Sequence, residues 1–219
     1  MHGFVPFPDE RAAAYRAAGY WNGRPLASLL DDAASRWPER PAVIDGGTTL
    51  SYALLDAAAD RAAAGLHRLG VGAGDRVLLQ LPNSCAFAIT LFGLLRVGAI
   101  PVLCLPGHRA AEIGHLATIS DAVGIVIPDA TAGFDYPAMA AELGLRRLIL
   151  DDASEGSPAP RVTPDPAAPA LLLVSGGTTG MPKLIPRTHN DYVYNAIASA
   201  QLCELTSDDV YLAALPAAH

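Results

Sequence analysis

A nine-residue stretch near the end of the chain combines residue types that bind phosphate. Residues 175–183 read SGGTTGMPK, so three glycines, three hydroxyl side chains and one lysine fall within nine positions. The apolar run ALLLV at 170–174 precedes them and is typical of a buried strand. Glycines after a strand can turn backbone N–H groups toward an anion, hydroxyls add donors, and a lysine adds a compact positive charge. The stretch therefore predicts a loop that holds a polyphosphate.

Two other interpretations of this loop are weaker. A Walker A loop requires Gly-Lys-Ser/Thr, whereas Pro182 precedes Lys183 here. A polar surface turn could be rich in glycine and threonine, but a plain turn needs neither the hydroxyls nor the lysine.

Helices and strands alternate along the chain that leads to this loop. The apolar spacing predicts helices at 26–37, 51–69, 84–97, 109–120, 137–143 and 190–202, and strands at 76–81, 100–104, 124–127, 148–151, 170–174 and 210–215. Residues 42–52 predict a hairpin that turns at Gly46-Gly47. Strands that alternate with helices predict right-handed crossovers, so the fold class is α/β, with a parallel sheet covered by helices on both faces.

Composition divides the chain into four parts. We expect an N-terminal extension with the first helix at 1–45 and a first α/β subdomain at 46–152. Residues 153–169 are rich in proline, serine and alanine and predict a linker or long surface loop. Residues 170–219 then begin a second α/β subdomain that carries the loop and that stops before it is complete.

Charge and composition exclude several classes of function. The 219 residues are 51% hydrophobic with a net charge of −7 and no block of basic residues, which argues against nucleic acid or an anionic membrane as a partner. No signal peptide is visible, and Arg96 and Pro101 interrupt the longest apolar stretch, 85–105. The widely spaced Cys85, Cys104 and Cys203 predict reduced core thiols. We therefore expect a cytoplasmic protein.

The order Ser-Gly-Gly-Thr-Thr-Gly-x-Pro-Lys at 175–183 resembles the phosphate loop of the adenylate-forming enzymes, which include acyl-CoA synthetases, nonribosomal peptide adenylation domains and luciferases. The following LIPRTHNDY, at 184–192, is narrower and resembles the aryl-acid adenylating enzymes of siderophore biosynthesis, both salicyl-AMP ligases of the mycobactin type and 2,3-dihydroxybenzoate-AMP ligases. Further matches are TLSYALLD at 49–56, LLRVGAIPVLCLPGHR at 94–109 and LAALPAAH at 212–219. The resemblance thus extends over nearly the whole chain.

This resemblance implies a fold and a reaction. The fold would be an incomplete N-terminal domain of an adenylate-forming enzyme, so the chain would be a fragment and inactive alone. The whole enzyme would join salicylate or 2,3-dihydroxybenzoate to the α-phosphate of ATP and release pyrophosphate. It would then pass the acyl group to the phosphopantetheine thiol of an aryl carrier protein.

The resemblance also implies the roles of individual residues. Lys183 and His219 would be catalytic, and His219 would also contact the aryl acid at the wall between the acyl pocket and the adenylate. Mg²⁺ would bridge the phosphates, and its protein ligand in this family lies beyond His219, so no metal ligand is expected here. The residues expected to hold the β- and γ-phosphates of ATP are Ser175, Gly176, Gly177, Thr178, Thr179, Gly180 and Lys183.

Other residues keep two interpretations open. His189 either contacts substrate or positions the loop by hydrogen bonds, and His108 and Arg109 either shape the pocket or have an ordinary structural role. His115 and His67 are expected on helix surfaces. Neither a paired-cysteine nor an HExxH metal motif is present, and no GxSxG elbow. Two alternative functions remain, a truncated non-catalytic nucleotide-binding module and a ligase for another carboxylic acid that resembles acyl-CoA synthetases.

Overall fold

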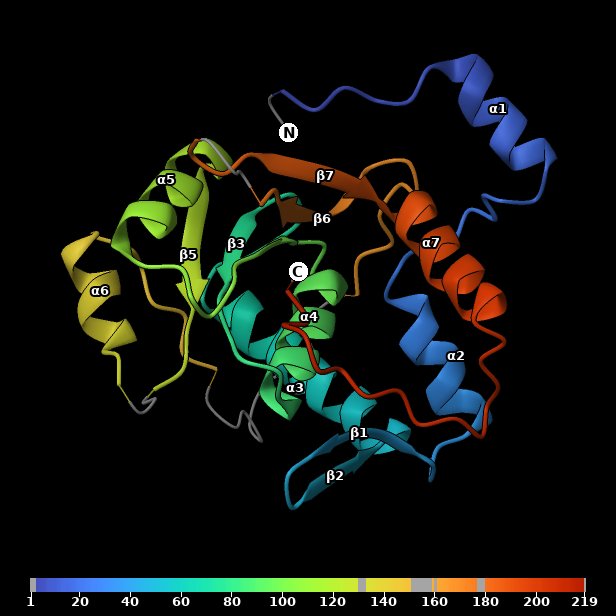
Figure 1. Ribbon diagram of the computed structural model, residues 1–219, viewed down its shortest axis with the longest axis horizontal. Coiled ribbons are helices and arrows are strands. Elements are labelled where there is room, and N and C mark those ends of the chain that lie inside the picture. The colour runs from blue at the N-terminus through green and yellow to red at the C-terminus, as the bar shows by residue number, and fades with distance from the viewer. Residues whose placement is uncertain (1–2, 130–132, 151–158, 160, 177–179, 219) are drawn as a thin grey trace.

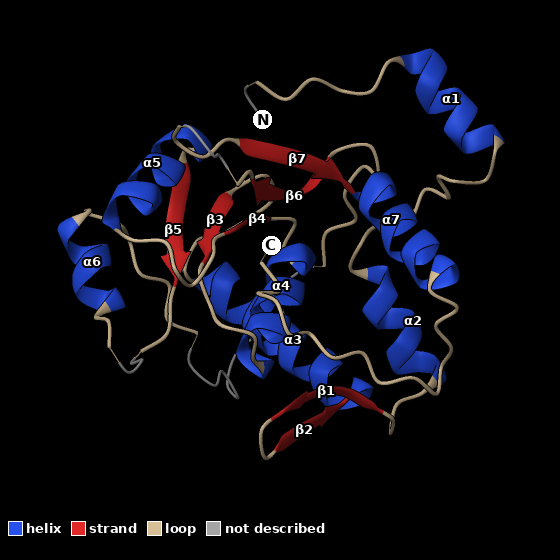
Figure 2. Cartoon of the chain, viewed as in Figure 1, coloured by secondary structure: helices blue, strands red, loops and turns tan. Residues whose placement is uncertain are grey.

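A computed structural model describes residues 3–129, 133–150, 159, 161–176 and 180–218. Its centre is a five-stranded sheet in the order β5-β3-β4-β6-β7 (Figures 1 and 2). The strands are β3 (Arg76–Leu79), β4 (Ile100–Leu103), β5 (Ala122–Val126), β6 (Pro169–Val174) and β7 (Leu184–Thr188). Neighbouring strands among β5, β3, β4 and β6 are parallel, and β7 pairs antiparallel with β6.

Helices cover both faces of this sheet. Val77 and Leu79 of β3 lie in one core cluster with residues of α3 (Tyr52–Arg68) and α4 (Cys85–Arg96). Leu78, between them, lies in a second cluster with residues of α5 (Ala110–Ser120) and α6 (Tyr136–Glu142). Successive side chains of a strand point to opposite faces, so this alternation buries β3 from both sides. The predicted α/β class, with a mainly parallel sheet between helices, is confirmed.

The remaining elements surround this centre. They are α1 (Asp9–Ala17), α2 (Ser28–Arg36), α7 (His189–Leu202) and the antiparallel hairpin of β1 (Pro41–Asp45) and β2 (Thr48–Ser51). Figure 1 shows α3 and α4 between the sheet and this hairpin, with α2 and α7 along another side of the molecule. The predicted hairpin is confirmed, and so are the helix caps: the Ser51 hydroxyl accepts from the Leu54 N–H of α3, and the Ser84 hydroxyl accepts from the Phe87 N–H of α4.

Two predicted strands are absent from the described residues, and one strand was not predicted. Residues 148–150 form no strand, because the chain there meets β5 only at the isolated bridge between Ile125 and Arg147, and Leu148 is apolar because it fills the core. Residues 210–215 have no strand partner among the described residues, and Leu212 is 83% exposed. Strand β7 was not predicted; Pro186 within it cannot donate to a ladder, which β7 tolerates because it is an edge strand.

The cysteine prediction holds only in part. All three cysteines are unpaired, and Cys104 is buried as expected. Cys203, the C-cap residue of α7, is exposed and Cys85 is only half-buried, so neither is a fully buried core thiol.

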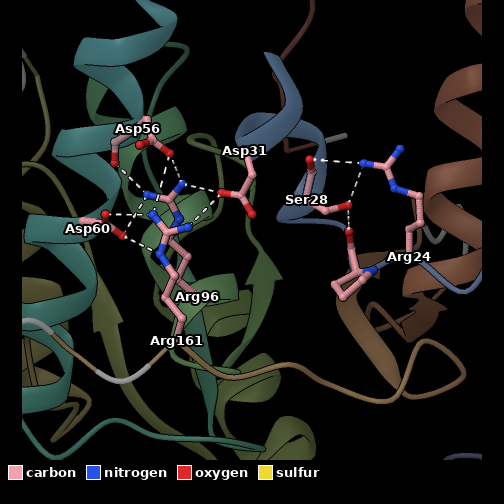
Figure 3. Close-up of polar contacts among 8 residues, drawn as sticks. Arg24, Ser28, Asp31, Asp56, Asp60, Arg96 and Arg161 are labelled. Atoms are coloured by element: carbon pink, nitrogen blue, oxygen red, sulfur yellow. Dashed lines mark hydrogen bonds and ion pairs between the residues drawn. The ribbon is translucent and has the colours of Figure 1, made fainter. Parts of the chain in front are cut away.

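A cluster of charged side chains joins α2, α3, α4 and the segment at Arg161 (Figure 3). Arg96 of α4 is only 2% exposed and pairs with Asp31 of α2 and with Asp56 and Asp60 of α3. Arg161 lies on the same carboxylates, 2.8 Å from Asp60 and 3.2 Å from Asp31. The next residue, Val162, donates its N–H to the Arg96 carbonyl at 2.9 Å.

These contacts fasten the end of the predicted linker just before β6 begins. Since β6 pairs with β4, the segments before and after 153–169 contribute to one sheet. The predicted boundary between two subdomains at residue 170 is untested and stays a prediction.

The two arginines of the charge cluster make a matched pair for a stability test. We expect Arg96→Met to lower the free energy of unfolding by about 3 kcal/mol, because it removes the buried partner of three carboxylates. Arg161→Met should lower it by at most about 1 kcal/mol, because Arg161 is 49% exposed and solvent screens its ion pairs. Urea unfolding at pH 7 measures both values, and equal losses would contradict the account.

Candidate functional site

The candidate site lies at the carboxyl-terminal ends of the parallel strands. The segments after β3, β4 and β6 all begin at this edge, because parallel strands end on the same side of a sheet. Ligands of open α/β sheets bind in the crevice beyond these strand ends. The loop at 175–183 leaves β6 there, so the fold places it where a ligand is expected.

Ser175 and Lys183 close the base of this loop, and we call this pair the neck. The Ser175 N–H donates to the Lys183 carbonyl at 2.9 Å, and the Lys183 N–H donates to the Ser175 hydroxyl oxygen, also at 2.9 Å. The neck continues the antiparallel ladder of β6 and β7, whose last pair is Val174 and Leu184. The predicted phosphate loop is therefore the connection of a hairpin anchored on a buried strand.

The glycines of the loop act through their missing side chains. Within the described part of the chain, a Cβ added to Gly176 or Gly180 would meet no atom within 4 Å. This space beside the backbone lets a bulky anion approach the N–H groups. The expectation that glycine supplies unusual dihedrals in the loop stays a prediction. Gly177, Thr178 and Thr179 lie outside the described residues.

Lys183 has the exposure and freedom of a ligand-binding side chain. It is exposed, and no carboxylate in the described part of the chain pairs with its ammonium group. It is also the only lysine of the 219 residues, whereas every other basic side chain apart from the histidines is an arginine. The one compact ammonium charge of the chain thus stands at the neck of the loop.

The connection from β4 to α5 lies at the same carboxyl-terminal ends of the strands and forms one wall of the candidate site. Gln80, fully buried after β3, donates its amide to the carbonyls of Leu105 at 3.1 Å and His108 at 2.9 Å. The His108 Nδ1 accepts from the Leu105 N–H at 3.2 Å. Burial lowers the pKa of His108, and nearby Glu112 partly opposes this. Because its Nδ1 accepts, that nitrogen carries no proton, and the ring braces this connection.

Arg109 braces the same connection from outside. Its guanidinium donates to the carbonyls of Pro106 and His108, both at 2.9 Å, and lies 4.0 Å from the centre of the Phe134 ring. No described contact joins His108 or Arg109 to residues 175–183, so both shape the wall rather than the loop.

The residues after β7 bind the N-terminal extension. The His189 Nδ1 accepts from the Leu26 N–H at 3.0 Å, and the Asn190 side-chain oxygen accepts from the Gly23 N–H at 3.1 Å. Thr188 caps α7, and Arg187 forms an ion pair with Asp191. Asp191 does lie in the first turn of α7, as expected. The His189 ring thus bonds to the extension, and the described residues show no contact between it and the loop; its expected role in positioning the loop stays a prediction.

Asn83 is a residue that the sequence analysis missed. Its amide nitrogen donates to the carbonyls of Ala213 at 2.9 Å and Leu215 at 2.8 Å, and its oxygen accepts from the Ala217 N–H at 2.7 Å. Ala218 is 3% exposed in the main core cluster, and Figure 1 shows the last segment returning from α7 to α4. The segment that leads to His219 is therefore held beside the end of β3. His219 itself lies outside the described residues.

Two searches of the described residues bear on other kinds of site. In that part of the chain, no group of three or more histidine, cysteine or acidic side chains is arranged to hold a metal ion. None of its helices combines the length and the apolar character needed to cross a membrane.

Comparisons with known proteins find a matching family and relatives along the whole chain. Residues 30–219 match the family described as AMP-binding enzyme. The chain is 61% identical along its whole length to a salicyl-AMP ligase / salicyl-S-ArCP synthetase of Mycobacterium tuberculosis, and 42% identical to a 2,3-dihydroxybenzoate-AMP ligase of Bacillus subtilis. It covers 43% of the length of each of these relatives.

A solved structure is similar over nearly all of the chain. The apo structure of MbtA from Mycobacterium smegmatis is 56% identical and superimposes with a TM-score of 0.91. The match covers 99% of this chain and 44% of that one.

The buried His189 predicts a pH-dependent stability. Burial lowers its pKa to about 4, with a smaller opposing effect from Asp165, whereas the unfolded chain protonates it near 6.5. The unfolded state therefore binds more protons between these values, so stability is full above about pH 6.5 and falls by roughly 3 kcal/mol toward pH 4.

Urea unfolding across this pH range checks the prediction. We expect His189→Gln to remove most of the pH dependence between 4 and 6.5, while His67→Gln, at an exposed position of α3, leaves it in place. The same slope in both variants would show that other groups cause it.

Proposed function

Because this chain belongs to the AMP-binding enzyme family, we propose that the complete protein activates an aryl carboxylic acid with ATP. The observation that carries the proposal is the neck, which presents the only lysine of the chain at the carboxyl edge of the sheet. The 61% identity to a salicyl-AMP ligase supports an aryl acid as the substrate. Since the chain spans less than half of that relative, the activity is proposed for the complete protein.

In this proposal the loop binds the β- and γ-phosphates of ATP. Backbone N–H groups beside the open Gly176 and Gly180 would approach the phosphate oxygens, and the Lys183 ammonium would neutralise their charge. The hydroxyl of Ser175 already accepts from the Lys183 N–H, so its own proton is free to donate outward. The proposed contacts, which include three residues outside the described part, are Ser175, Gly176, Gly177, Thr178, Thr179, Gly180 and Lys183.

The proposed chemistry explains why donors are needed at this place. A carboxylate oxygen of the acid attacks the α-phosphorus of ATP, and the bond from that phosphorus to the bridging oxygen breaks. The electron pair leaves with pyrophosphate, whose negative charge grows in the transition state. Fixed donors and a lysine around the leaving group stabilise that charge more than they stabilise bound ATP.

Mg²⁺ is part of the proposal as a companion of ATP. It supplies positive charge between the phosphate oxygens when bound. Among the described residues, no group of three or more histidine, cysteine or acidic side chains is arranged to hold a metal ion, and the resemblance puts the protein ligand of Mg²⁺ beyond His219.

The acid and the acceptor of the second step are further parts of the proposal. His219 would contact the aryl acid, since Asn83 holds the residues before it beside the end of β3. The acyl group would then move to the phosphopantetheine thiol of an aryl carrier protein: the thiol sulfur bonds to the acyl carbon and AMP leaves. Salicylate and 2,3-dihydroxybenzoate differ by one hydroxyl, which a buried hydrogen-bonding partner would distinguish strongly.

ATP–pyrophosphate exchange by the complete protein tests the proposed function. The panel contains salicylate, 2,3-dihydroxybenzoate, benzoate, a fatty acid and several amino acids. We expect exchange with the two hydroxybenzoates at least about tenfold above the other acids, because a hydroxyl that pairs in a buried pocket gains more than about 1.4 kcal/mol. Exchange confined to fatty or amino acids would overturn the aryl-acid assignment, and no exchange from folded protein would favour a non-catalytic nucleotide-binding role.

A further inference from the structure

His115 of α5 makes a contact with the loop that the proposed function does not use. Its Nε2 lies 2.9 Å from the carbonyl oxygen of Pro182, 67 positions further along the chain. A carbonyl oxygen can only accept a hydrogen bond, so Nε2 carries the proton and donates it. His115 was expected on a helix surface, but it is half-buried against the loop.

The bonded carbonyl belongs to the peptide group that joins Pro182 to Lys183. On its other side the same peptide group donates the Lys183 N–H to the Ser175 hydroxyl oxygen at 2.9 Å. Both polar atoms of one planar unit are therefore held, from two different elements. Rotation of this plane, which would swing the Lys183 side chain away, breaks both hydrogen bonds together.

The helix that carries His115 is itself fixed to both strands of the neck. Ile113 and Leu116 of α5 are fully buried in the core cluster that contains Leu172 of β6. Val174 and Leu184, the last ladder pair before the neck, pack against the same cluster. Movement of α5 relative to the loop would disturb this packing, so His115 donates from a rigid support.

We propose that His115 is a positioning residue for the phosphate-binding loop, which acts by fixing the peptide plane that orients Lys183. The proposal rests on the proposed function for its kinetic consequence, since the position of Lys183 matters where it meets phosphate. Its structural consequence is independent of catalysis. Without the His115 hydrogen bond, the Pro182–Lys183 peptide moves more freely and Lys183 is less well oriented.

The test compares three variants of the complete protein. His115→Leu removes the donor, His115→Gln keeps an amide N–H donor, and His67→Leu is the control for loss of an exposed helical histidine. One readout is ATP–pyrophosphate exchange, with KM measured separately for ATP and for the acid. The other is the initial rate of tryptic cleavage after Lys183 in the folded protein, which reports the mobility of the loop directly.

We expect His115→Leu to raise KM for ATP about five- to tenfold, the effect of losing one hydrogen bond, while KM for the acid changes less than about twofold. Cleavage after Lys183 should accelerate in His115→Leu, and His115→Gln should restore both values toward the wild type. His67→Leu should leave both unchanged.

Three results overturn the proposal. They are an unchanged KM for ATP with unchanged cleavage in His115→Leu, an equal rise of both KM values, and His115→Gln behaving like His115→Leu. If the wild type exchanges with no acid, the proposed function fails, and the cleavage rates alone then decide the role of His115.

Discussion

The antiparallel pairing of β6 with β7 is the constraint on which the candidate site depends. A loop that stabilises developing charge must hold its donors in place before the reaction, because reorganising them during it costs free energy. Here the loop begins on a strand buried from both faces and returns along the sheet edge, and the Ser175–Lys183 neck closes it. The position of Lys183 is thus set by backbone hydrogen bonds rather than by its own flexible side chain.

The surrounding contacts all limit movement of this hairpin. Arg161 and Val162 fasten the chain before β6, and His189 and Asn190 fasten the chain after β7 to the N-terminal extension. Fastening both ends limits movement of the strands that carry Ser175 and Lys183. The narrow motif LIPRTHNDY, which resembles aryl-acid enzymes, contributes here mainly to this support.

Much of the fold could be predicted from the sequence because its signals are local. Hydrophobic spacing predicted α3 and α4, and the serines before them, Ser51 and Ser84, were predicted as their N-caps. The errors arose where tertiary context decides: Leu148 is apolar for the core without a ladder, and Pro186 is tolerated because β7 is an edge. The loop was proposed from residue types, but the roles of Asn83 and His115 could not be, since each side chain bonds to backbone more than 60 positions away.

Acetylation of Lys183 in the complete protein tests the central claim, that this residue meets the terminal phosphates of ATP. Mass spectrometry gives the rate of labelling of the peptide that contains it, with the other labelled amines as internal references. We predict that ATP with Mg²⁺, and pyrophosphate alone, slow labelling of Lys183, whereas AMP does not. Equal labelling rates with and without ATP, at concentrations that saturate exchange, would contradict a phosphate-binding role for the loop.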